Sequence, residues 1–247
     1  MTDPASTRAA VIVGAGDATG GAIARAFAAE GLTVCVNRRE RNADALERLA
    51  QSIHDAGHQA RAFPADARDE DAMIALFDQV EAEVGPVEVA VFNIGANVNF
   101  PIGETTVRVY SKVWEMACLA GFLMGREAAK RMTPRRRGTI IFTGATASLR
   151  GGSGFAAFSG AKAALRMLAQ SMARELGPQG IHVAHVVIDG AIDTEFIRDR
   201  HPDFDNARAQ DLILNPDAIA AQYVALHKQP RSAWTHELDL RPWGEKW

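Results

Sequence analysis

Short apolar runs alternate with longer stretches of helical spacing along the whole 247-residue chain. The short runs predict buried strands, and the stretches whose apolar residues recur every three or four positions predict amphipathic helices. The predicted strands cover residues 9–14, 32–37, 60–66, 87–95, 138–145, 181–190 and 235–240. The predicted helices cover residues 20–31, 43–57, 69–84, 107–132, 156–177 and 217–228.

This alternation is typical of a parallel sheet whose strands are joined by helices. Because such connections are right-handed, helices cover both faces of the sheet, and the pattern predicts a Rossmann-type doubly wound α/β fold. No repeat or low-complexity linker interrupts it, so residues 1–247 are expected to form a single domain. A ligand of such a domain is expected at the carboxyl ends of the strands.

Composition and charge argue against several classes of protein. The hydrophobic fraction of 47% and the charged fraction of 23% are typical of a soluble globular chain. The net charge is −3 and no basic block is present, so we expect no nucleic acid or membrane partner. No segment reaches the roughly 18 apolar residues of a membrane span, and the polar N-terminus does not resemble a signal peptide. With Cys35 and Cys118 expected as free buried thiols, the chain is predicted to be cytoplasmic and without a metal site.

The first predicted strand ends in GAGDATG, residues 14–20, which leads directly into a helix. Glycines permit close approach of the backbone to a pyrophosphate, and the N-terminus of the helix offers free N–H groups and the positive end of its dipole. The segment therefore predicts a dinucleotide site, with an ordinary strand–helix turn as the alternative. The predicted contacts in this loop are Gly14, Asp17, Ala18, Thr19 and Gly20.

The loop resembles the G-x-x-x-G-x-G motif of the short-chain dehydrogenase/reductase family, with Ala18 in the place of the middle glycine. The resemblance continues through PAD (64–66), FNIG (92–95), GPQGIHVAHVV (177–187) and GAIDT (190–194), and so covers nearly the whole chain. It implies that Asp66 contacts the adenine and that Thr194 lies near the nicotinamide carboxamide. The further cofactor contacts that it implies are Ala67, Asn93, Gly95 and Ile192.

Three departures from the family pattern lie near these motifs. Phe92 and Ile94 replace family residues at the end of the fourth strand, and Asp189 stands where the family usually has a proline. Residues 240–243 also read LRPW, where the family usually has D-G-G.

The residues after the second predicted strand are expected to select the nucleotide. Arg38 lies where relatives that prefer NAD carry an aspartate, and Arg38 and Arg39 offer two guanidinium groups to a 2′-phosphate. Asp17 argues the other way, because its carboxylate would repel that phosphate. On balance the sequence favours NADP(H) over NAD(H), with a solvated surface pair of arginines as the alternative.

The resemblance also implies where catalysis would take place. In this family a serine binds the substrate oxygen, a tyrosine gives the proton, a lysine lowers the pKa of the tyrosine and binds the nicotinamide ribose, and an asparagine supports a proton path. This chain keeps Lys162 but has Phe158, Ala145 and Cys118 in the other three positions. Losing a general acid costs about 10²–10⁴ in rate, so ordinary ketone reduction is expected to be impaired.

Other residues near these positions are candidate acids. Lys162 itself is expected to contact the ribose or, alternatively, to act as acid or base with a pKa lowered by an apolar pocket. Further candidates are Thr143, Thr146, Ser153, Ser159 and Asp189, together with the two tyrosines, Tyr110 and Tyr223.

Two functions of different classes fit these observations. The first is an NADP(H)-dependent oxidoreductase with an atypical active site, acting on a small molecule such as an imine, an enone or another carbonyl compound. The second is a catalytically silent cofactor-binding or structural relative, with a non-redox lyase or isomerase on the same fold as a further alternative. Residues 193–215 are expected to form a substrate lid, and the tail RPWGEKW (241–247) to cover the site or pack across a subunit. Helices 107–132 and 156–177 are expected to build a homodimer or homotetramer, as the resemblance implies.

Overall fold

Seven parallel strands form one sheet in the computed structural model, which describes residues 8–244. The strands are β1 (Ala9–Val13), β2 (Thr33–Arg38), β3 (Ala60–Pro64), β4 (Val87–Phe92), β5 (Gly138–Thr143), β6 (Ile181–Ile188) and β7 (Glu237–Leu240). Their order is β3-β2-β1-β4-β5-β6-β7, and every neighbouring pair is parallel. The direction of winding changes between β1 and β4, which is where a doubly wound sheet opens a crevice for a ligand. The predicted fold is confirmed.

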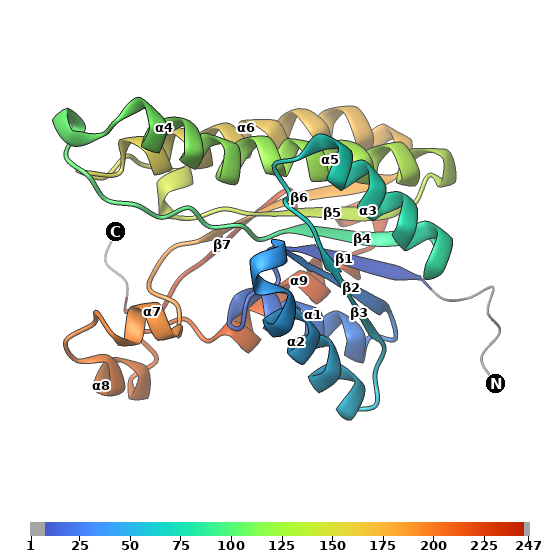
Figure 1. Ribbon diagram of the computed structural model, residues 1–247, viewed down its shortest axis with the longest axis horizontal. Helices are drawn as coiled ribbons and strands as arrows, with labels where there is room; N and C mark the ends of the chain where they lie inside the picture. The colour runs from blue at the N-terminus through green and yellow to red at the C-terminus, as the bar shows by residue number, and fades with distance from the viewer. Residues whose placement is uncertain (1–7, 245–247) are drawn as a thin grey trace.

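Helices cover both faces of this sheet (Figure 1). The α-helices are α1 (Thr19–Ala29), α2 (Ala43–Asp55), α3 (Glu70–Glu83), α4 (Val107–Trp114), α5 (Ala120–Met132), α6 (Ala156–Leu176), α7 (Glu195–Arg198), α8 (Phe204–Ala209) and α9 (Pro216–His227). Figure 1 shows α3, α4, α5 and α6 on one face and α1, α2 and α9 on the other. Short 3₁₀ turns lie at Glu40–Asn42, Ile102–Glu104, Thr133–Arg135, Thr146–Ser148, Gly177–Gln179 and Arg231–Ala233.

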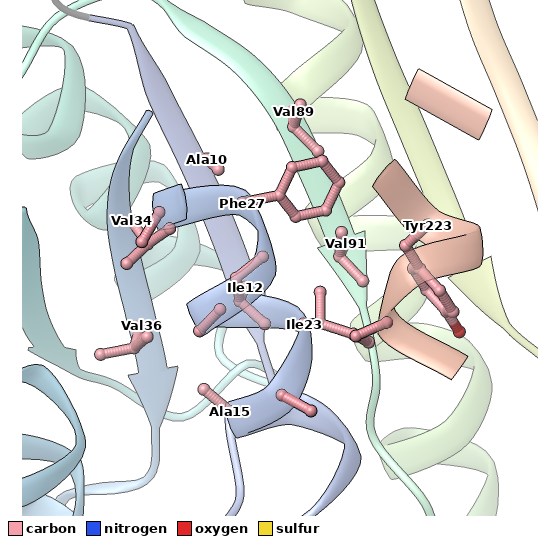
Figure 2. Close-up of a cluster of buried hydrophobic side chains, with 14 of the residues drawn as sticks. Ala10, Ile12, Ala15, Ile23, Phe27, Val34, Val36, Val89, Val91 and Tyr223 are labelled. Carbon is pink, nitrogen blue, oxygen red and sulfur yellow. The ribbon is translucent and has the colours of Figure 1, made fainter. Parts of the chain in front are cut away.

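The core is divided into two layers because successive strand side chains point to opposite faces. Figure 2 shows the layer in which Ile12 and Val91 of the sheet meet Ile23 and Phe27 of α1 and Tyr223 of α9. The alternate strand residues pack with α3, α5 and α6 on the other face. Burial on both faces explains why the strands read as continuous apolar runs.

The helix predicted over residues 107–132 is divided by a π-helical turn at Glu115–Leu119, between α4 and α5. A π turn holds one more residue than an α turn, and such turns are rare and concentrated at functional sites. Cys118 lies within it. The predicted lid, residues 193–215, contains the short helices α7 and α8, which Figure 1 shows in orange apart from the two helical layers.

Candidate active site

Two adjoining cavities lie at the carboxyl ends of the strands. The larger has a volume of about 750 Å³ and the smaller about 250 Å³. They share lining residues from the ends of β1 and β4, so together they form one continuous cleft; the shared residues are Gly14, Gly16, Asn93, Ile94 and Gly95. This is the predicted position for the ligand of a doubly wound sheet.

The loop after β1 leaves its backbone open toward the cleft. Gly14 has a φ of +89°, and a Cβ there would lie 2.8 Å from the carbonyl carbon of Asn93, so only glycine fits. A Cβ at Gly16, in contrast, would meet nothing within 4 Å. Helix α1 begins at Thr19 without a side-chain cap, because Ala18 precedes it, and its first N–H groups are not occupied by a capping side chain. The loop thus has the features of an anion-binding helix N-terminus.

All of the predicted cofactor residues line this cleft. Gly14, Asp17, Ala18, Thr19, Gly20, Asn93, Gly95, Lys162, Ile192 and Thr194 line the larger cavity. Arg38, Arg39, Asp66 and Ala67 line the smaller one. Segments far apart in the sequence therefore meet as the motif spacing predicted.

The smaller cavity is rich in arginine. Besides Arg38 and Arg39 it is lined by Arg41 and Arg68, which the sequence reasoning missed. Burial, followed by the charge of Arg41, lowers the pKa of Arg39, as expected where cations gather.

Two carboxylates offset part of this charge. The Asp66 carboxylate accepts a hydrogen bond of 2.6 Å from Arg68 Nη2, and hydrogen bonding from Arg68 holds its pKa at about 2. Asp17 Oδ1 lies 3.7 Å from Arg38 Nη1, although Asp17 itself is largely exposed.

Lys162 reaches the cleft from α6 and is buried. Its Nζ donates hydrogen bonds to the carbonyl oxygens of Thr143 at 2.8 Å and Ile94 at 3.1 Å, so it joins the ends of β5 and β4. Burial lowers its pKa to about 8. Phe158, one helical turn earlier, and Ala145 both line the larger cavity.

Cys118 differs from the other predicted site residues because it lines neither cavity. It lies in a buried apolar cluster with Val113, Ala117 and Phe158, and burial raises the pKa of its thiol. The sequence pattern placed this residue on one long helix, but it does not show which way a side chain points from a π turn.

Several of the candidate acids already have hydrogen-bond partners. The Thr143 hydroxyl lies 2.8 Å from the Tyr223 hydroxyl, which is fully buried, and burial raises the pKa of that phenol. Thr146 Oγ1 donates to Asp189 Oδ1 at 2.5 Å. Tyr110 is partly exposed on α4, and neither tyrosine lines the cleft.

The two serines differ in position. Ser159 lines the larger cavity, and its buried hydroxyl has no hydrogen-bond partner among the described residues. Ser153 does not line the cleft; its carbonyl oxygen accepts a hydrogen bond from Asn99.

A half-buried polar cluster fixes the helix that carries Lys162. Arg166, one turn further along α6, donates two hydrogen bonds of 2.6 Å to the Glu237 carboxylate on β7. His185 Nδ1 lies 3.1 Å from the same carboxylate, and burial lowers the pKa of His185 to about 4. The cluster ties α6 to β6 and β7 behind the cleft.

The predicted lid segment, residues 193–215, is held by ion pairs and by the C-terminal segment. Asp193 pairs with Arg198 of α7 and Arg208 of α8. Trp243 Nε1 donates to the carbonyl oxygen of Gln210 at 2.9 Å, which places this part of the predicted tail beside the lid. The rest of that tail, residues 245–247, lies outside the described residues.

Arg150 was missed by the sequence reasoning, although it lines the larger cavity together with Phe196 and Ile197 of the lid. The available signal was its place in the loop after the fifth strand, where the ends of parallel strands carry ligand sites. Within residues 8–244 no group of three or more His, Cys, Asp or Glu side chains is placed to hold a metal ion. Nor does that range contain a helix long and apolar enough to cross a membrane.

The sheet order and the glycine-lined crevice define a Rossmann-type α/β protein. A family model described as short chain dehydrogenase matches residues 8–204, and the chain belongs to this family of oxidoreductases. The predicted family resemblance is therefore confirmed.

Individual relatives agree with this assignment. The chain is 31% identical over 198 residues to a cis-4-hydroxycyclohexanecarboxylate dehydrogenase of Sinomonas cyclohexanicum, covering 80% of this chain and 78% of the relative. A crystal structure of a short-chain dehydrogenase from Rhodopseudomonas palustris is 49% identical, with a TM-score of 0.82, and the match covers 96% of this chain and 99% of the other. A metagenomic short-chain oxidoreductase in complex with NADP is 26% identical, with a TM-score of 0.81, over 97% and 99% of the two chains.

Proposed function

We propose that this protein is an NADP(H)-dependent oxidoreductase that acts on a small molecule through an atypical active site. The observation that carries the proposal is the continuous cleft, in which a glycine-lined loop, an arginine-rich end and the buried Lys162 amine adjoin one another. Membership of a family of dehydrogenases supports the reaction class.

The residues present fit a nicotinamide dinucleotide. A Cβ would meet nothing within 4 Å at Gly16 and the start of α1 has no side-chain cap, so this loop would hold the pyrophosphate. Arg38 and Arg39 would pair with a 2′-phosphate. Asp66 and Ala67 would lie beside the adenine, and Thr194 and Ile192 beside the nicotinamide. When bound, this cofactor supplies or accepts the hydride.

The preference for NADP(H) follows from charge. Four arginines line the smaller cavity, and the carboxylates paired with two of them, Asp17 at Arg38 and Asp66 and Glu115 at Arg68, offset only part of their charge. A guanidinium cluster binds a phosphate more strongly than a ribose hydroxyl, because charge-assisted hydrogen bonds are stronger than neutral ones.

The substrate must suit a site without the usual proton donors. Phe158 and Ala145 present only carbon atoms to the larger cavity. Lys162 places a positive charge beneath this region and would hold the ribose through an N–H that the two carbonyl oxygens leave free. A polarised enone accepts hydride at carbon without a strong acid at its oxygen, and it fits this arrangement best. An imine that is already protonated needs no acid either, but its cationic nitrogen would be repelled by the Lys162 ammonium.

The loss of donors favours one second candidate. Ala145, Phe158 and Cys118 together remove the serine, tyrosine and asparagine functions, which fits a silent cofactor-binding relative as well as a changed mechanism. The two functions differ in whether bound NADPH is ever consumed.

We also propose a homodimer or homotetramer in the cytoplasm. Apolar side chains are exposed along the outer helices: Val107, Tyr110 and Trp114 on α4, Phe122 on α5 and Met167 on α6. An apolar surface of this kind is typical of a protein–protein interface. Sedimentation velocity over a range of protein concentrations would test this, and a monomer at all of them would contradict it.

Fluorescence titration of the purified protein with NADPH and, separately, with NADH tests the proposed function. We expect micromolar binding of NADPH and clearly weaker binding of NADH. The same samples are then mixed with a panel of imines, enones and ketones, and consumption of NADPH is followed by absorbance. Binding without any turnover would favour the silent relative, and no binding of either nucleotide would contradict both functions.

A further inference from the structure

Arg150 is the charged side chain that faces the substrate half of the larger cavity, which is bounded by Ala145, Arg150, Phe155 and Phe158. The other two charged residues of the cavity wall lie in other parts of the site. Asp17 belongs to the loop after β1, and the Lys162 ammonium is buried and donates to two carbonyl oxygens. The Arg150 side chain, in contrast, is 49% exposed.

A buried carboxylate holds Arg150 in place from behind. Arg150 Nη1 and Nη2 each lie 3.3 Å from a different oxygen of Asp189, whose side chain is only 1% exposed. Asp189 is itself fixed, because Thr146 donates to it at 2.5 Å and Arg241 Nη2 lies 3.5 Å away. Arg241 also pairs with Asp239. The guanidinium is therefore oriented before any ligand arrives, which lowers the entropy cost of binding.

Arg150 retains hydrogen-bonding capacity toward the cavity. A guanidinium has five N–H donors in a planar fork, and contact with the two Asp189 oxygens uses only part of them. The Asp189 carboxylate is shared by Arg150, Arg241 and the Thr146 hydroxyl, so it neutralises the exposed Arg150 guanidinium only in part. The local charge therefore favours an anion, and the planar fork favours a carboxylate in particular.

The rest of this wall is apolar. Around Arg150 the lining consists mainly of carbon, from Ala145, Ala147, Phe155, Phe158, Ile192, Phe196 and Ile197. A ligand that fits such a wall has an apolar body with one anionic end, since isolated polar groups would lose their hydration against these side chains.

We propose that Arg150 binds the carboxylate of the substrate, and that the rest of the substrate is an apolar ring or short chain that packs on the carbon-lined wall. The inference rests on the proposed function only in treating this ligand as a substrate. Binding of the carboxylate itself follows from the cavity wall alone, so the two can fail separately.

Calorimetric titration with cyclohexanecarboxylate and its neutral isostere, cyclohexanecarboxamide, tests this directly. The protein is titrated at neutral pH, with and without saturating NADP⁺. We expect the carboxylate to bind at least tenfold more tightly than the amide, with the difference shrinking as salt is added. Equal affinity of the two probes, or no binding of either, would overturn the proposal.

Variants of Arg150 then test whether this residue causes the preference for the carboxylate. In Arg150→Gln the ratio of carboxylate affinity to amide affinity should fall to about one, while the amide affinity itself is unchanged. Arg150→Lys should retain part of the preference for the carboxylate, because it keeps the charge but not the planar fork. The matched control is Arg174→Gln, on the exposed side of α6, which should keep the full preference. An unchanged ratio in Arg150→Gln, with a thermal unfolding curve showing that the variant is folded, would also overturn the proposal. If the unaltered protein binds neither NADPH nor NADH, that result would instead contradict the proposed function.

Discussion

The ammonium of Lys162 lies 2.8 Å from the carbonyl oxygen of Thr143, so α6 is hydrogen-bonded directly to the end of β5. Both residues are buried, and Ala145 and Phe158 lie between them in the sequence. A lysine without its phenol thus keeps a structural function: it satisfies backbone oxygens at the base of the cleft. That function needs no catalysis, so it is independent of whether Lys162 takes part in a reaction.

The pH dependence of stability should reveal this buried amine. Burial lowers the pKa of Lys162 from 10.5 to about 8, so the unfolded chain binds the proton more tightly than the folded protein. The cost of burying the charge is therefore fully present below about pH 8 and is relieved as pH rises toward 10.5. At one pKa unit per 1.36 kcal/mol, the shift amounts to roughly 3 kcal/mol at most.

Urea unfolding of the native protein and of Lys162→Met between about pH 7 and 10 measures this effect. The free energy of unfolding of the native protein should rise with pH relative to that of the variant. The thiol of Cys35 acts in the opposite direction, because burial raises its pKa to about 12, but it is present in both proteins and cancels in the difference. Parallel curves for the two proteins would show that Lys162 titrates normally. Lys112→Met, at an exposed position on α4 whose partner Glu115 is 4.0 Å away and also exposed, is the control.

Arg38 should strengthen the binding of NADPH, and Asp17 should weaken it. The Asp17 carboxylate is exposed and 3.7 Å from Arg38, so it weakens the field at a 2′-phosphate without being needed for the fold. Asp17→Asn should tighten NADPH binding by roughly two- to fivefold, the range of an exposed ion pair. Binding of NADH should stay constant.

Fluorescence titration at low and high salt checks this expectation, and the gain should shrink with salt. Asp55→Asn, at the far end of α2, provides a matched loss of charge. A parallel change in NADPH and NADH affinity would place Asp17 at the pyrophosphate and not at the 2′-phosphate.

The strand–helix alternation was sufficient to predict the fold, because burial on both faces makes every strand of a parallel sheet a continuous apolar run. Motif spacing was sufficient to place Gly14, Arg39 and Thr194 along one cleft, since the carboxyl ends of parallel strands share one edge.

The local sequence pattern could not predict contacts that depend on where each side chain points in the folded protein. Thr146 and Asp189 were separate candidates, and their hydrogen bond joins residues 43 positions apart at the ends of neighbouring strands. The π turn that contains Cys118 adds one residue to a helix, a change too small for apolar periodicity to detect. Arg150 was missed for a similar reason, because nothing local indicates that a loop arginine will be held by a buried carboxylate.

Tyr223 and Thr143 form a buried pair of hydroxyl groups 2.8 Å apart, and breaking it should destabilise the protein. Tyr223→Phe leaves the Thr143 hydroxyl buried without its partner, at a cost of about 1–2 kcal/mol. Thr143→Val should cost a similar amount for the reciprocal reason. In the double variant neither unsatisfied hydroxyl remains, so its cost should be clearly below the sum of the two single costs. Urea unfolding of the four proteins measures the coupling, and strict additivity would mean that the two hydroxyl groups do not stabilise each other.

Placing two hydrogen-bond donors at positions 145 and 158 should raise ketone reduction. Ala145 and Phe158 line the same cavity as Lys162, so a serine hydroxyl and a phenol at these positions would face the region where a carbonyl oxygen is expected. Ala145→Ser combined with Phe158→Tyr should raise NADPH-dependent reduction of cyclic ketones at least tenfold, because a general acid alone contributes about 10²–10⁴ in rate. The Lys162 ammonium would also lower the pKa of the new phenol.

The measurement is the rate of NADPH consumption across a ketone panel, with Ala145→Ser/Phe158→Leu as the control that has the hydroxyl but not the acid. NADPH affinity is measured in parallel, so that a change in binding is not read as a change in chemistry. If the double variant binds NADPH as the native protein does but reduces no ketone faster, the substrate oxygen does not lie between positions 145 and 158. The reacting carbon would then have to lie elsewhere in the cleft, and the imine and enone substrates would need a different orientation from the one that family members use for ketones.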